Sequence, residues 1–145
     1  FNRELPLVTP PAEDAFADML ANLRRIARPG SSLYLVSDFA GAERPHAREH
    51  LYQLAQHTEV TAIACADPLE AELPRAGRYA VTDGDARAEL QTADRHLRRD
   101  YRQRAQQRRQ ALSAEFQRLG IPLLEAHTDQ PPYALLQRYY GDTRR

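Results

Sequence analysis

The chain has 145 residues, which suits a single domain with one hydrophobic core. Its twenty basic residues are all arginines and balance twenty acidic ones, so the molecule as a whole is no electrostatic match for nucleic acid. The single Cys65 excludes an internal disulfide framework. No apolar run approaches the roughly 18 to 20 residues of a membrane span, and the start lacks a signal-peptide pattern. We expect a cytoplasmic segment without a membrane span, although a longer parent protein with a membrane anchor is compatible with these residues.

Residues 9–28 are predicted to form a helix. Thr9 is followed by two prolines, and a capping hydroxyl before prolines is typical of a helix start. Pro29 and Gly30 then end the helix. Apolar residues recur at three- and four-residue spacing and predict one buried helix face: Phe16, Met19, Leu20, Leu23 and Ile26.

Two nearly unbroken apolar runs, at residues 33–37 and 60–66, each end on an aspartate, Asp38 and Asp67. Such runs are typical of parallel strands that helices cover on both faces. A helix from about Pro45, with Leu51 and Leu54 turned inward, connects the two strands as a parallel crossover. Ligands of open α/β sheets bind beyond the carboxyl ends of the strands, so the two aspartates mark the functional edge.

Residues 77–92 have the alternation and turn chemistry of an inserted β-hairpin, with Asp83, Gly84 and Asp85 at the turn. A helix of residues 93–119 follows, and between Arg95 and Arg118 eight arginines stand against two acidic residues. Three of the arginines are our candidates for contact with an acidic protein partner: Arg98, Arg102 and Arg109. Nucleic-acid binding and a merely solvated surface are the alternatives for this helix.

A third short strand at residues 121–125 and a last helix at residues 131–140 complete the chain. The sum is an α/β fold of three layers, with a mostly parallel sheet and the hairpin inserted at about residues 77–92. Doubly wound domains usually carry more strands than three. Residues 1–145 therefore look like one partial domain, half of a Rossmann-like fold.

The motifs along the chain resemble the carboxyl-terminal half of bacterial proteins of domain of unknown function family 58, over about residues 20–136. The most specific part is the strand ending in Asp67-Pro68-Leu69-Glu70, followed by Glu72-Leu73-Pro74. The resemblance also rests on Ser37-Asp38-Phe39, the hairpin strand from Gly77 to Asp83, Tyr101, Gly120-Ile121 and Thr128-Asp129.

The resemblance implies a von Willebrand factor A-like domain, in which three loops hold Mg²⁺. Asp38 matches the aspartate that ends the fourth strand of that fold, and Thr9 is a possible match to the threonine of the middle loop. The Asp-x-Ser-x-Ser element of the first loop is absent from this chain. Because Mg²⁺ needs about six oxygen ligands, we expect no stable metal site and no cofactor in these residues, with Mg²⁺ reserved for a full-length parent.

The function that we expect is a non-enzymatic protein-interaction module, and the resemblance implies that it works with a MoxR-type AAA+ ATPase in assembling complexes. The alternative from another class is a divalent-metal-dependent hydrolase that uses Asp38 and Asp67. In the resembled fold the first strand pairs with the strand of residues 33–37. That strand is therefore predicted to have an open apolar edge here and to drive self-association, by edge pairing or by exchange of residues 1–8.

Overall fold

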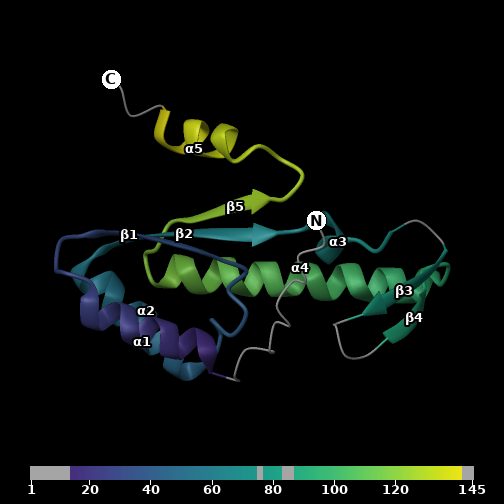
Figure 1. Cartoon of the computed structure of the whole chain (residues 1–145), viewed down its shortest axis with the longest axis horizontal. Helices are drawn as coiled ribbons and strands as arrows, with labels where there is room; N and C mark the ends of the chain where they lie inside the picture. The colour runs from purple at the N-terminus through teal and green to yellow at the C-terminus, as the bar shows by residue number, and fades with distance from the viewer. Residues whose placement is uncertain (1–13, 75–76, 83–86, 142–145) are drawn as a thin grey trace, which may run out of the picture.

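The computed structural model describes residues 14–74, 77–82 and 87–141, and these residues form an α/β fold (Figure 1). The expected elements are confirmed, with one short helix, α3, in addition. The last strand begins two residues later than expected, at Leu123 rather than Ile121. The elements are α1 (Ala15–Ile26), β1 (Ser32–Ser37), α2 (Pro45–His57), β2 (Glu59–Ala66), α3 (Pro68–Ala71), β3 (Arg78–Thr82), β4 (Arg87–Gln91), α4 (Arg95–Arg118), β5 (Leu123–His127) and α5 (Pro132–Tyr140).

The main sheet has three parallel strands in the order β1-β2-β5. Its register pairs Leu35 of β1 with Ala62 of β2, and Ala62 with Leu123 of β5. Strands β3 and β4 form a separate antiparallel hairpin, as the sequence predicted for residues 77–92. Thr92 closes this hairpin, because its hydroxyl oxygen accepts from the Gly77 amide at 3.0 Å and its own amide donates to the Gly77 carbonyl.

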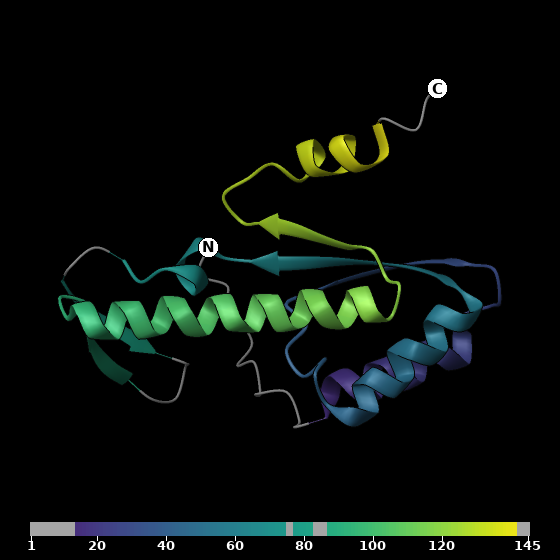
Figure 2. The ribbon, with the colours of Figure 1, turned by 180° about the vertical axis from the view of Figure 1, so that it is seen from behind.

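Helices lie on both sides of the sheet, and the core occupies one side. Figures 1 and 2 show α1, α2 and α4 on one side and α5 on the other. Helix α4 runs on past the carboxyl ends of the strands toward the hairpin (Figure 2). None of the described helices is both long and apolar enough to cross a membrane. The core residues with almost no exposure are Leu20, Ala42, Ala47, Leu51, Ala62 and Phe116.

The expectation that β1 is buried on both faces is wrong. Leu35 belongs to the core, but the alternate side chains of Tyr34 and Val36 are 56% and 62% exposed. Among the described helices only α5 lies on that side. It packs against β5 and reaches β1 through Tyr140, whose ring centroid is 6.4 Å from that of Tyr34. The apolar run predicted a strand correctly but overstated the helical cover.

Helix α1 is also less buried than its pattern predicted. Leu20 is fully buried, whereas Met19 and Ile26 are 42% and 76% exposed. These two positions lie on the flank of the apolar stripe, beyond the part of α1 that packs against α2 and the sheet. The expected helix start at Thr9 falls outside the described residues.

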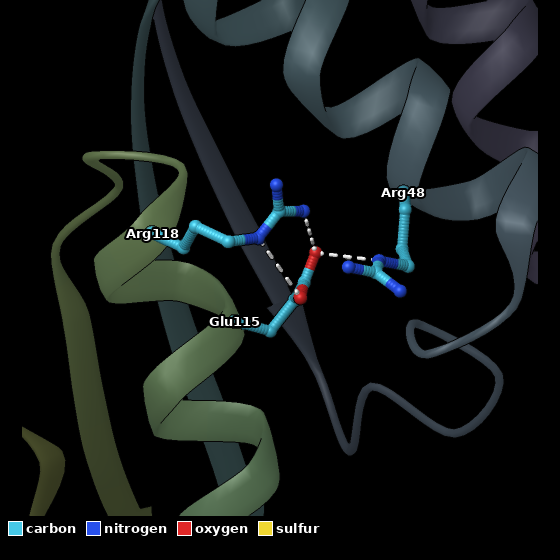
Figure 3. A network of polar contacts seen from close by, with 3 residues as sticks. All are labelled: Arg48, Glu115 and Arg118. Carbon is cyan, nitrogen blue, oxygen red and sulfur yellow. Dashed lines mark hydrogen bonds and ion pairs between the residues drawn. The ribbon is translucent and has the colours of Figure 1, made fainter.

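Glu115 of α4 joins that helix to α2 through Arg48, and it also binds Arg118 of its own helix (Figure 3). Its Oε1 accepts hydrogen bonds from Nη2 of Arg118 at 2.7 Å and from Nε of Arg48 at 2.8 Å. The Glu115 side chain is only 16% exposed. The hydrogen bond from Arg118 lowers the pKa of Glu115 most, with Arg48 adding to it against the opposing effect of burial. The carboxylate therefore stays ionised and fixes the C-terminal part of α4 against α2.

We predict that Glu115→Gln lowers the free energy of unfolding by about 1 kcal/mol at pH 7, a modest figure because both arginines are partly in water. Since folding lowers the pKa of Glu115, its contribution is present above the unfolded pKa, near pH 4, and is lost as the pH falls through the folded value. Urea unfolding of both proteins at pH 7 and pH 3 measures this difference. Glu70→Gln, at an exposed acid of α3, is the matched control. Equal midpoints at pH 7 would contradict the prediction.

Candidate functional site at the carboxyl edge of the sheet

Asp38 lies directly after β1, at the edge where the sequence placed the functional loops. Its Oδ1 accepts the Ala40 amide at 3.1 Å and the Ser37 hydroxyl at 3.3 Å. The Ser37 hydroxyl oxygen in turn accepts the Phe39 amide at 3.0 Å. Both side chains thus hold the backbone amides of a tight turn, a common use of serine and aspartate at strand ends. One carboxylate oxygen of Asp38 is committed to the shape of its own loop.

Phe39 completes this turn in an unusual backbone conformation. Its φ is +57°, the left-handed region, which costs a residue with a side chain about 1–2 kcal/mol. The side chain is 2% exposed, and its ring contacts Phe116 of α4 and Phe16 of α1 with centroid distances of 4.9 and 5.8 Å. The aromatic residue of the Ser-Asp-Phe motif is therefore a core residue that fixes where the Asp38 loop leaves the sheet.

Asp67 connects the carboxyl ends of β2 and β5. It caps α3, with Oδ1 accepting the Leu69 amide at 2.8 Å, and its Oδ2 accepts the Thr128 hydroxyl at 2.7 Å. The Thr128 amide donates to the Ala66 carbonyl at 3.1 Å. The hydrogen bond from Leu69, followed by that from Thr128, lowers the pKa of Asp67. The sequence indicated a turn residue here, but the link to Thr128 was missed. The only feature of the sequence that pointed to this contact was that Asp67 and Thr128 each follow a strand.

The acidic residues at this edge bear on the magnesium site that the family resemblance implies. They contain no group of three or more His, Cys, Asp or Glu side chains placed to hold a metal ion. Both oxygens of Asp67 and Oδ1 of Asp38 already accept internal hydrogen bonds. Mg²⁺ requires about six oxygen ligands, and this set falls far short of that number. Thr9, the other candidate ligand, lies outside the described residues.

The three candidate arginines of α4 lie on the same side of the helix as buried Phe116, at nearly whole-turn spacings. Arg102 forms an ion pair with Glu72, just after α3. Arg109 Nε lies 3.6 Å from Oε1 of Glu125 on β5, and Nε of Arg98 is buried without a hydrogen-bond partner. Contact of these arginines with an acidic partner stays a prediction. Arg102 and Arg109 would have to bind that partner while also contacting Glu72 and Glu125. The outward side of this part of α4 carries three exposed glutamines, Gln103, Gln107 and Gln110.

A second surface, which the sequence did not single out, lies on the uncovered side of β1. Tyr34 and Val36 point away from the core there, and the rings of Tyr140 and Tyr139 continue the surface, with their centroids 4.8 Å apart. We call these four residues the tyrosine face. A side-chain hydrogen bond to Tyr140 raises the pKa of Tyr34. The signal in the sequence was the pair of tyrosines that ends the last helix, but only the fold brings them to β1.

Comparisons with known proteins identify a family and leave the activity open. The family model described as "Protein of unknown function DUF58" matches residues 3–111. An uncharacterized protein of Mycobacterium avium is 31% identical over 127 residues, which cover 85% of this chain and 72% of the relative. Uncharacterized proteins of Mycobacterium bovis and Mycobacterium tuberculosis show the same identity, and the chain spans only 38% of their length. No solved structure matches the chain.

Phe39→Ala is expected to lower the free energy of unfolding by about 3–5 kcal/mol, because it leaves a cavity between Phe16 and Phe116. Thermal and urea unfolding followed by circular dichroism measure the loss. Tyr52→Ala serves as the control, since Tyr52 is an aromatic residue that is 53% exposed on α2. A Phe39→Ala protein as stable as this control would contradict the role of Phe39 in the core.

Asp67→Asn is expected to lower the melting temperature at pH 7. The substitution removes the carboxylate charge that the Leu69 backbone amide and the Thr128 hydroxyl stabilise. Folding lowers the pKa of Asp67, so this stability is present above about pH 4 and disappears as the pH falls through the folded pKa. Melting curves recorded from pH 7 downward should differ between the two proteins most at pH 7 and converge as the pH falls through the folded pKa of Asp67. Thr128→Val should reproduce part of the loss at pH 7, and Asp129→Asn should not. A difference in melting temperature that does not shrink as the pH falls would refute the electrostatic account.

Proposed function

Because this chain belongs to the DUF58 family of proteins of unknown function, we propose that it is a non-enzymatic protein-interaction module of the von Willebrand factor A-like type. Three features support the proposal. The parallel order β1-β2-β5 suits the second half of such a sheet, Asp38 ends β1 in the position of the third metal-site loop, and the carboxyl-edge loops carry polar residues. The family resemblance supports the type of domain that we propose. The surface of this chain supports the place where a partner would dock.

The tyrosine face carries the proposal. Contiguous apolar side chains that are exposed to water are typical of protein-binding sites, and tyrosine is enriched at such sites. Tyr34, Val36, Tyr139 and Tyr140 are each between 41% and 62% exposed, yet the ring of Tyr140 contacts the rings of both Tyr34 and Tyr139. Rings held in this way lose little conformational freedom when a partner covers them. Parallel sheets are normally covered on both faces, and a partner helix or loop over this face would complete that arrangement.

The partner that we propose is a MoxR-type AAA+ ATPase, which the family resemblance suggests for the whole protein. The module would hold the ATPase beside a complex that is being assembled or activated. No catalytic step is assigned to this chain, since the aspartates that the hydrolase alternative would use act in their own loops as a turn former and a helix cap.

The test measures binding of the full chain to a purified MoxR-type ATPase from the same genome, by interferometry with and without nucleotide. We expect saturable binding that Tyr139→Ser with Tyr140→Ser weakens about tenfold or more, because it removes two rings in edge-to-face contact from the interface. Tyr52→Ser is the control, since it removes a tyrosine of slightly greater exposure on α2, on the other side of the sheet. If both changes weaken binding equally, the tyrosine face is not the docking surface. If the wild-type chain does not bind, the ATPase is not its partner.

A further inference from the structure

One flank of α4 carries four arginines, which we call the arginine row: Arg95, Arg99, Arg102 and Arg109. At 3.6 residues per turn they lie within about 80° of one another around the helix, and the row is about 21 Å long. The row begins at the end of α4 that runs past the strands (Figure 2). The two acidic residues of the helix, Asp100 and Glu115, lie at least about 100° away around it. No carboxylate of α4 therefore belongs to this flank.

The side chains of the arginine row are open to a partner. Among the residues that the structure describes, the side chains of Arg95 and Arg99 are exposed and form no hydrogen bond or ion pair. The other two arginines each contact one carboxylate, of Glu72 and Glu125, yet their side chains remain 62% and 61% exposed. Exposed ion pairs are weak because water competes for both charges, and each guanidinium has five N–H donors. All four arginines can therefore bind a carboxylate from outside the chain.

The charges of the arginine row do not stabilise α4 itself. Arg95 and Arg99 are four residues apart and Arg99 and Arg102 three, so each pair brings like charges together on the helix surface. The first turn contains no acidic residue, and positive side chains there oppose the helix dipole. Asp94 caps the helix, but its carboxylate already accepts two backbone amides of that turn. Carboxylates of a partner beside the row would relieve this repulsion.

We propose that the arginine row docks an acidic helix of another protein, which lies along α4 with carboxylates opposite the four guanidinium groups. A helix repeats its side chains at the same rise per residue as α4, so carboxylates at four-, three- and seven-residue spacing meet successive arginines. Pairs of arginine and carboxylate can form two parallel hydrogen bonds, which fixes their geometry. The methylene stems of the arginines add apolar area against the partner.

A protein partner fits the surroundings of the arginine row better than a nucleic acid does. Glu72 and Glu125 lie beside the row and are partly exposed, so they would repel a continuous phosphate backbone. The formal net charge of the chain is zero, which gives no overall attraction to a polyanion. The row also contains no aromatic side chain on which a base could stack. An acidic helix can place its few carboxylates away from both glutamates.

This inference goes beyond the proposed function, because the arginine row and the tyrosine face lie on different elements. The probe is a fluorescein-labelled helical peptide of alanine and glutamine that carries four glutamates at the spacing of the row. A second peptide has the same composition, with its glutamates spread around the helix. Fluorescence anisotropy with the full chain at low salt should show that the matched peptide binds at least about threefold more tightly than the second one. Binding should weaken as the salt concentration rises.

Two pairs of substitutions show whether the arginine row is the docking surface. Arg95→Gln with Arg99→Gln should weaken binding of the matched peptide at least about fivefold, because it removes two exposed ion pairs. The same change should leave the melting temperature equal or higher, because it removes like-charge repulsion within α4. Arg25→Gln with Arg28→Gln is the matched control, since it removes two exposed arginines at the end of α1. This control should leave the affinity nearly unchanged.

Several results would overturn the proposal. Equal affinity for the two peptides, or no binding of either at low salt, would leave the arginine row without a specific acidic partner. An equal loss in the control would reduce the effect to net charge, and a lower melting temperature of the Arg95→Gln, Arg99→Gln protein would assign these arginines to the fold. Duplex DNA that displaces the matched peptide and binds more tightly than it does would indicate a nucleic-acid surface instead. None of these results depends on whether the ATPase binds.

Discussion

The packing of Phe39 between Phe116 and Phe16 is the contact on which the rest of this structure depends. It joins the carboxyl end of β1 to α4 and α1, three elements that are far apart in the sequence. To reach that position the residue adopts φ of +57°, at a cost that burial of an aromatic ring more than offsets. The same conformation turns the chain sharply after Asp38, so that Ser37 and Asp38 hold the amides of the loop. Core packing therefore decides the shape of the first loop at the functional edge.

The core lies on one side of the sheet, and this asymmetry explains why the tyrosine face is exposed on the other. Helices α1, α2 and α4 bury Leu35 and Ala62 on one face, while α5 alone among the described helices covers the other. Tyr34 and Val36 consequently stay partly exposed, and their apolar side chains suit a partner that covers this face.

Helix α4 illustrates how charge in a sequence differs from charge on a surface. Eight arginines in one helix indicated a basic face for a partner. The fold brings Glu72 and Glu125 to two of the candidate residues, Arg102 and Arg109, and buries Nε of Arg98. These contacts join α4 to segments before and after it in the chain. Helical spacing alone places the three arginines on one side, but which carboxylates meet them depends on how far α4 runs beyond the strands.

The sequence by itself determined the elements, their order and the parallel crossovers, because apolar periodicity, prolines and glycines act over a few residues. It also placed Asp38 and Asp67 at strand ends and predicted the hairpin and the outer position of β1. Only the tertiary structure decided that β1 is covered on one face, that Asp67 binds Thr128, and that the last two tyrosines reach Tyr34. These features join residues far apart in the chain. They depend on where whole helices come to rest on the sheet, and local patterns do not encode that position.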